Sequence, residues 1–214
     1  MPTTCLFDLD GTLSDPKPGI TGCIQYALET LQQPVPTKDE LEWAIGPPLL
    51  DTFLTLLNGD EAAAARGLSL YRERFGTLGM YENELYPGIP ECLGKLTEAG
   101  MQLFVATSKP HFYAKPITEH FGINHIFKHV HGSEMSGERI HKTDLLAYIL
   151  EVEKIDPAET IMIGDRKHDI LAAKAHGIAT IGVLYGYGSR EELTAAGADM
   201  LVETPEEILP AILK

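Results

Sequence analysis

Helices and strands alternate along this chain from about residue 86 onward, and that alternation constrains the fold more than any other feature. Apolar segments typical of strands recur at 127–131, 160–163, 179–183 and 200–202. Apolar residues at helical spacing predict helices at 89–99, 114–121, 143–153 and 169–176. Such alternation predicts an α/β fold, with a parallel sheet that is covered by helices on both faces.

The segment 17–84 has a different pattern of apolar residues, with several amphipathic helical stretches and no convincing strand. Thr37 is followed by Glu40 three residues later, which matches the capping box that begins many helices. We therefore expect an all-helical domain in residues 17–84. It would be inserted into a core domain made of residues 1–16 and 85–214.

Two carboxylates, Asp8 and Asp10, stand two residues apart where a short apolar segment gives way to Gly11. In an extended strand, residues i and i+2 project to the same side, so both side chains should share the carboxyl end of this strand. Ligands of open α/β sheets bind at that end, and paired carboxylates there suit a metal and a phosphate. Asp-Gly also suits a simple turn, and from this segment alone both interpretations stay open.

Hydroxyl and ammonium groups follow a second strand-like segment. The apolar run 101–106 leads into Thr107, Ser108 and Lys109, and farther along the chain Lys142 precedes a predicted helix. Each of these residues is a weak signal by itself, because serine and threonine end many strands and most lysines are solvated. Their weight depends on the other strand ends.

Two further carboxylates follow the apolar segment 160–163, which is typical of a buried strand. The segment runs into Asp165, and Asp169 follows four residues later at the start of a predicted helix. This spacing predicts a second acidic pair at a strand end, comparable with the first.

The composition is that of an ordinary globular protein, because 214 residues with 44% hydrophobic content can bury a sizeable core. A formal net charge of −14 argues against nucleic-acid binding, which relies on lysine and arginine. Three scattered cysteines, no leader and no membrane-spanning apolar run favour a cytoplasmic protein, expected to be a monomer or weak dimer. His125, His129 and His131 are interpreted as surface or locally bonded side chains.

The polar residues at these strand ends resemble the four motifs of the haloacid dehalogenase superfamily of phosphotransferases. Those motifs are an Asp-x-Asp strand end, a strand end with serine or threonine, a lysine, and a Gly-Asp-x-x-x-Asp turn. They are matched here, in the same order, by Asp8 and Asp10, Thr107, Lys142, and Asp165 with Asp169. The resemblance covers the whole chain and implies a Rossmann-like core with an all-helical cap domain.

The resemblance also implies a Mg²⁺-dependent reaction and a role for each acidic residue in it. Asp8 would be the nucleophile, forming an aspartyl-phosphate, and would also bind the metal; Asp10 would be the general acid and base. The metal would be held further by the backbone carbonyl of Asp10 and by Asp165, through the hard oxygen ligands that Mg²⁺ prefers. Asp169 would hold metal-bound water or the lysine from the second shell.

The residues that the resemblance assigns to the phosphate are Thr107, as a hydrogen-bond donor, and Lys142, as a neutralising charge. Further substrate contacts are expected from Gly11, Thr12, Ser108, Lys109 and Arg72.

Segments outside the four motifs look like those of phosphoglycolate phosphatases and nucleoside 5′-nucleotidases. They are the segment 45–49, Tyr71-Arg72 and the glycine-rich run 182–188. The resemblance therefore implies a phosphomonoester hydrolase acting on a small-molecule phosphate, with a nucleoside 5′-monophosphate favoured slightly over phosphoglycolate. A sugar phosphomutase and a non-catalytic phosphate-binding protein remain as alternatives. Carbon–halogen cleavage is disfavoured, because dehalogenases of the superfamily lack the residue that Asp10 matches.

Overall fold

The computed structural model describes residues 2–213, which divide into two compact units. The core unit contains the chain up to Ser14 and from Leu85 onward, and the helical unit is Asp15–Glu84. The chain passes from one unit to the other within the short strands β2 (Ser14–Asp15) and β3 (Glu84–Leu85). Among the described residues, no helix is long and apolar enough to cross a membrane.

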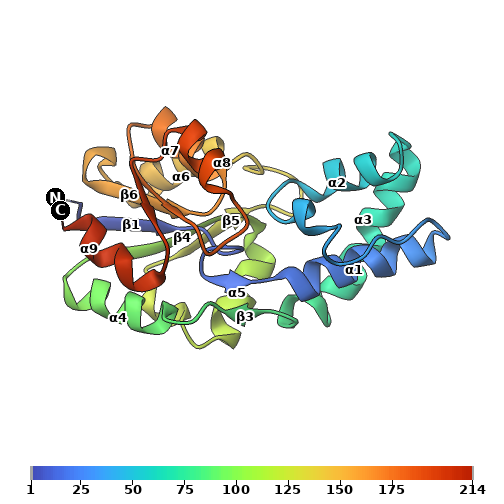
Figure 1. Ribbon diagram of the computed structural model, residues 1–214, viewed down its shortest axis with the longest axis horizontal. Coiled ribbons are helices and arrows are strands. Elements are labelled where there is room, and N and C mark those ends of the chain that lie inside the picture. Colours follow the sequence, from blue (N-terminus) through green and yellow to red (C-terminus); the bar gives the residue numbers. More distant parts are fainter. Residues whose placement is uncertain (1, 214) are drawn as a thin grey trace. The chain divides into compact units, whose positions relative to one another are not determined.

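A six-stranded parallel sheet forms the centre of the core unit, with the strand order β5-β4-β1-β6-β7-β8 (Figure 1). The strands are β1 (Thr4–Phe7), β4 (Gln102–Pro110), β5 (Val130–Ser133), β6 (Thr160–Gly164), β7 (Ala179–Val183) and β8 (Met200–Val202). All of β1 is buried, as a central strand covered on both faces requires. The predicted α/β fold is confirmed.

Helices cover both faces of the sheet. One face carries α6 (Lys142–Glu153) and α7 (Lys167–Ala175), and the other carries α4 (Ile89–Glu98) and α9 (Ile208–Ile212) (Figure 1). The core unit also contains α5 (His111–His120) and α8 (Arg190–Ala196). This arrangement leaves the carboxyl ends of the strands as the edge where loops gather.

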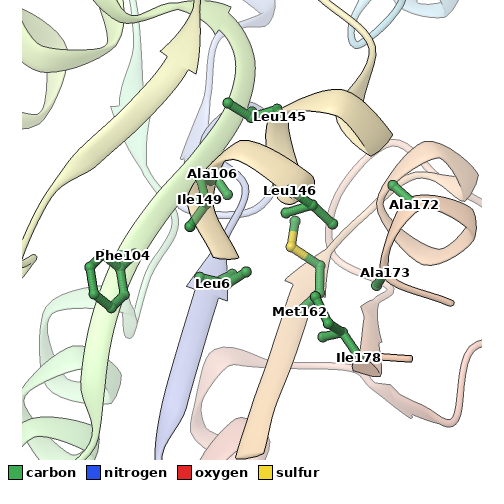
Figure 2. Packing of buried hydrophobic residues seen from close by; sticks show 10 residues of the cluster. All are labelled: Leu6, Phe104, Ala106, Leu145, Leu146, Ile149, Met162, Ala172, Ala173 and Ile178. Carbon is green, nitrogen blue, oxygen red and sulfur yellow. The ribbon is translucent and has the colours of Figure 1, made fainter. Parts of the chain in front are cut away.

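Buried hydrophobic side chains fill the space between the sheet and helices α6 and α7 (Figure 2). Leu6, Phe104 and Met162 come from three neighbouring strands and face Ile149 of α6 and Ala173 of α7. The full cluster is Leu6, Phe104, Ala106, Leu145, Leu146, Ile149, Met162, Ala172, Ala173 and Ile178. Close packing here fixes the position of α6, and therefore of the side chain at its first residue.

The register of the sheet brings the ends of the three central strands together. Phe7, the last residue of β1, pairs with Val105 of β4 and with Ile163 of β6. The backbone N–H of Asp8 then donates to the carbonyl oxygen of Ile163 at 3.0 Å. The residues that follow these strands, including Asp8 and Asp165, therefore leave the sheet at the same edge.

The helical unit is built from α1 (Lys17–Thr30), α2 (Leu49–Leu56) and α3 (Glu61–Phe75), with 3₁₀ turns at Glu42–Ala44 and Gly79–Tyr81. Helix α3 packs against both α1 and α2. A Cβ at Gly67 of α3 would lie 2.7 Å from the Phe53 ring of α2, so glycine permits the close approach of these two helices.

Two local expectations differ from the structure. The strand predicted at 127–131 lies instead at Val130–Ser133, because a 3₁₀ turn over Asn124–Ile126 occupies the preceding chain. Thr37 and Glu40 do exchange the hydrogen bonds of a capping box, at 2.8 and 3.3 Å, yet no α-helix begins there. After the capping box the chain continues in turns and the 3₁₀ turn Glu42–Ala44, and the next α-helix, α2, begins only at Leu49.

Candidate active site

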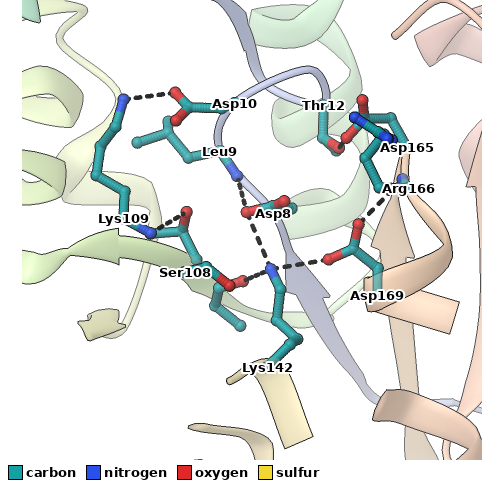
Figure 3. A network of polar contacts seen from close by, with 12 residues as sticks. Asp8, Leu9, Asp10, Thr12, Ser108, Lys109, Lys142, Asp165, Arg166 and Asp169 are labelled. Atoms are coloured by element: carbon teal, nitrogen blue, oxygen red, sulfur yellow. Dashed lines mark hydrogen bonds and ion pairs between the residues drawn. The ribbon is translucent and has the colours of Figure 1, made fainter. Parts of the chain in front are cut away.

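A buried lysine joins two carboxylates at the carboxyl edge of the sheet. Lys142 is the first residue of α6, and its Nζ lies 3.0 Å from Asp8 Oδ1 and 2.8 Å from Asp169 Oδ1 (Figure 3). Nζ also donates to the carbonyl oxygen of Ala106 at 2.7 Å. Burial alone would lower the pKa of Lys142, but the charges of Asp169 and Asp8 outweigh it and raise that pKa. The lysine is therefore held as a cation beside Asp8.

Asp10 belongs to a second ion pair, with Lys109 from the end of β4. The Nζ of Lys109 lies 2.6 Å from Asp10 Oδ1, and both side chains are largely buried (Figure 3). Burial raises the pKa of Asp10, and the charge of Lys109 offsets only part of that rise. A carboxyl group with a raised pKa suits a proton donor and acceptor near neutral pH.

Asp165 is the most enclosed of the acidic residues, with no exposed surface. One carboxylate oxygen accepts from Thr12 Oγ1 at 3.3 Å and the other from the backbone N–H of Tyr187 at 2.9 Å. Burial, together with the charges of Asp169 and Asp8, raises the pKa of Asp165 well above its ordinary value. Such crowding of carboxylates is unfavourable until a cation or protons offset it.

The pKa of Asp169 is raised by the same two causes, burial and a neighbouring carboxylate. Burial raises its pKa, Lys142 pulls the pKa back, and the charge of Asp8 adds to the rise. Its Oδ2 accepts from the backbone N–H of Arg166 at 3.2 Å, so both oxygens of Asp169 have protein partners (Figure 3).

The carboxylates of Asp8, Asp165 and Asp169 form an acidic group that fits a hard divalent cation. One oxygen from each lies within 4.8 Å of the others. Three oxygen donors and no nitrogen or sulfur donor are the chemistry that Mg²⁺ prefers. The side chain of Asp10 is held by Lys109 instead, so any metal contact of Asp10 falls to its backbone carbonyl, and that contact stays a prediction.

The glycine-rich loop after β7 encloses Asp165, and its role was missed by reasoning from the sequence. It supplies the Tyr187 N–H to Asp165, and the Tyr185 hydroxyl donates to the carbonyl oxygen of Thr12 at 3.0 Å. A Cβ at Gly186 would overlap the carbonyl oxygen of Gly11 and Cβ of Asp165. Glycines alternating with tyrosines directly after a buried strand were the available signal.

Replacing Gly186 by alanine is expected to displace Asp165 or the Asp10-Gly11 turn, since the added methyl group has no space. Overpacking of this kind costs about 1–3 kcal/mol of unfolding free energy. Urea unfolding measures that cost. The matched control is Gly94→Ala in the interior of α4, where a Cβ meets nothing within 4 Å and a gain of about 0.5–1 kcal/mol is expected. Equal effects of the two substitutions would contradict the prediction.

A turn does follow the first acidic pair, at Gly11, and it lies against one of the predicted site residues. Its φ is +81°, a conformation that favours glycine, and its N–H donates to the carbonyl oxygen of Ser14 at 2.8 Å. The turn places the backbone of Gly11 against the Asp165 carboxylate, and a Cβ at Gly11 would overlap that carboxylate. The turn therefore borders the candidate site, and a functional role for Asp8 and Asp10 stays a prediction.

The remaining predicted residues are placed as follows. Thr107 is buried near the end of β4, where its Oγ1 accepts from the backbone N–H of Lys109 at 3.3 Å. The carbonyl oxygen of Ser108 accepts from the Ser133 hydroxyl at 2.8 Å. Arg72 lies on α3 of the helical unit and is half-buried, and its role as a substrate contact stays a prediction.

The relatives of this chain include enzymes with three different names. A 5′-nucleotidase from Pseudomonas aeruginosa is 48% identical over 190 residues, which cover 89% of this chain and 86% of that protein. The tyrosine-protein kinase PtkA from Mycobacterium tuberculosis is 39% identical over 187 residues, covering 87% of this chain and 64% of that protein. A phosphoglycolate phosphatase from Vibrio parahaemolyticus is 29% identical over 214 residues, covering 96% and 94%.

A solved structure and a family model agree with these relatives. The crystal structure of a predicted phosphatase from Clostridium acetobutylicum superposes with a TM-score of 0.95 and 39% identity, covering 100% of this chain and 99% of that one. The family model described as haloacid dehalogenase-like hydrolase matches residues 5–183. The chain therefore belongs to the haloacid dehalogenase-like hydrolase family, as one of its phosphatases.

Proposed function

We propose that the protein is a Mg²⁺-dependent phosphomonoester hydrolase that acts through an aspartyl-phosphate on Asp8. The observation that supports this proposal is the position of Asp8, which contacts the buried cation of Lys142 and has a carboxylate oxygen within 4.8 Å of oxygens of Asp165 and Asp169. A carboxylate can approach an anionic phosphate only where positive charge offsets the repulsion. Lys142 supplies part of that positive charge. A metal cation bound by the acidic group would supply the rest.

In the proposed first step, an oxygen of Asp8 attacks phosphorus, and the bond from phosphorus to the leaving oxygen breaks. Asp10 gives its proton to that oxygen, so the product leaves as an alcohol. In the second step Asp10 takes a proton from water, whose oxygen attacks phosphorus and releases inorganic phosphate and the free Asp8 carboxylate. The raised pKa of Asp10 supports both transfers, because it brings the carboxyl group nearer to neutral pH.

The remaining residues bind and orient. Thr107 lies near the end of β4, two residues before Lys109, and would donate its hydroxyl hydrogen to a phosphoryl oxygen. Lys142 would offset the charge of Asp8 and draw the phosphate toward it. When bound by Asp8 and Asp165, Mg²⁺ would neutralise the charge on the phosphate. Asp169 would position Lys142 through their 2.8 Å contact.

A nucleoside 5′-monophosphate is the favoured substrate class, with phosphoglycolate second. Support comes from the segments 45–49, Tyr71-Arg72 and 182–188, and from the 48% identity to a protein named 5′-nucleotidase. Phosphoglycolate phosphatases match more distantly, at 29–30% identity. The relative named tyrosine-protein kinase favours a second candidate, transfer of a phosphoryl group to a tyrosine hydroxyl.

Inorganic phosphate release from a panel of substrates tests the proposal. The panel contains nucleoside monophosphates, phosphoglycolate, sugar phosphates and ATP, each with Mg²⁺ and with a chelator. We expect selective release from a monophosphate that falls to background on chelation. Release that is indifferent to the chelator would contradict the metal dependence. Label from ATP that appears on protein tyrosine would favour the kinase reaction, and isomerised sugar phosphate without release would favour a mutase.

A further inference from the structure

A second group of metal-ligating side chains lies in the core unit and shares no residue with the candidate active site. His129, His131 and Glu153 each offer one ligand atom, and these atoms lie within 4.8 Å of one another. Glu153 Oε1 lies 2.6 Å from Nδ1 of His129 and 2.8 Å from Nε2 of His131. Two imidazoles therefore converge on one carboxylate oxygen.

The fold brings these three residues together at the edge of the sheet. His131 is in β5, the edge strand, and pairs with Ala106 of β4; the carbonyl oxygen of His129 accepts from the N–H of Val105 at 3.1 Å. His129 and His131 are two residues apart on extended chain, so they project to the same side. That side faces α6, whose last residue is Glu153.

The surroundings suit a bound cation that enters from solvent. His131 and Glu153 are largely covered, whereas 64% of the His129 side chain is exposed. The rings of Phe104 and Tyr148 lie 6.2 and 6.0 Å from the His131 ring and hold it in place. The carboxyl end of a helix also carries partial negative charge, which favours a cation beside Glu153.

The positive charge of Arg139 acts on His131 and opposes a cation there. Arg139 lies over the Tyr148 ring at 4.3 Å. Its guanidinium pairs with the carboxylates of Glu134 and Glu138, which offset its charge. The net charge of −14 adds a general attraction for cations.

We propose that His129, His131 and Glu153 form a second metal site, selective for Zn²⁺ or a similar ion that prefers imidazole. Two histidines and one glutamate are a recurrent zinc ligand set, with bonds of about 2.0–2.2 Å. The Asp8 group offers only oxygen and suits Mg²⁺, so the two sites would differ in the ion that they take. Bound Zn²⁺ would replace the shared hydrogen bonds and tie β5 to the end of α6, the helix that begins with Lys142.

Calorimetric titration of the whole protein with Zn²⁺, in excess Mg²⁺ and a non-chelating buffer, tests this proposal. We expect one Zn²⁺ to bind per chain. His129→Gln should weaken binding by more than about tenfold, since loss of a ligand costs at least as much as loss of a group that orients one. Because the His129 side chain is exposed, we expect this variant to fold like the wild type. Glu153→Gln serves as a second variant once circular dichroism shows that it is folded.

The matched control is His125→Gln, an exposed histidine in the adjoining 3₁₀ turn, which should bind Zn²⁺ like the wild type. No Zn²⁺ binding by the wild type would overturn the proposal. Equal binding by the wild type and His129→Gln would also overturn it, because the ion would then sit at the Asp8 carboxylates or elsewhere.

Discussion

Asp8→Asn is expected to lower kcat by at least about 1,000-fold while the protein stays folded. Asparagine keeps the size of the side chain, and its amide oxygen can still accept from the N–H of Leu9, as Asp8 Oδ1 does at 2.7 Å. It cannot, however, form a stable acyl-phosphate. Lys142 keeps its contact with Asp169, so the substitution leaves no buried cation without a partner. Phosphate release from the best substrate of the panel measures the loss.

The control for this variant is Asp144→Asn, which removes the same charge from an exposed position on α6. We expect wild-type turnover from it. Urea unfolding should show both variants to be about as stable as the wild type. Asp8→Asn that is folded and turns over like the control would show that another group attacks the phosphate.

The strand ends carried most of what could be predicted about the site. Asp8 and Asp165 follow buried apolar strands, and the sheet register that brings them together is a general property of parallel sheets. Lys142 was placed only by the order of the motifs, because nothing local distinguishes it from a solvated lysine. Its burial depends on α6 packing over Phe104 and Met162, which is a tertiary effect.

The partners of these residues could not be predicted, because they depend on long-range contacts. Lys109 and Asp10 are 99 residues apart, and their ion pair needs β1 and β4 to lie side by side. The N–H of Tyr187 carries no signature of its own in a sequence, since every residue except proline has one. The capping box of Thr37 shows the converse case: its local hydrogen bonds formed, but no α-helix follows them.

Lys142→Met is expected to cost about 3–5 kcal/mol of unfolding free energy, measured by urea unfolding in the presence of a chelator. The substitution keeps an unbranched side chain but removes the cation that lies between Asp8 and Asp169. Two carboxylates would then face each other with little solvent, in a site where burial already raises the pKa of Asp169. Phosphate release should fall as well, because Lys142 would no longer supply its part of the charge that offsets Asp8.

Two further variants compare the buried contacts of Lys142 with an ordinary exposed ion pair. Lys174→Met removes a lysine from an exposed pair with Asp199, at 2.9 Å, and should cost no more than about 1 kcal/mol. Lys142→Met combined with Asp169→Asn should be more stable than Lys142→Met alone, because the second change removes the carboxylate left without a partner. If Lys142→Met cost no more than Lys174→Met, the buried lysine would not be what holds the two carboxylates together. If the double variant were less stable than Lys142→Met, the loss would come from packing rather than from charge.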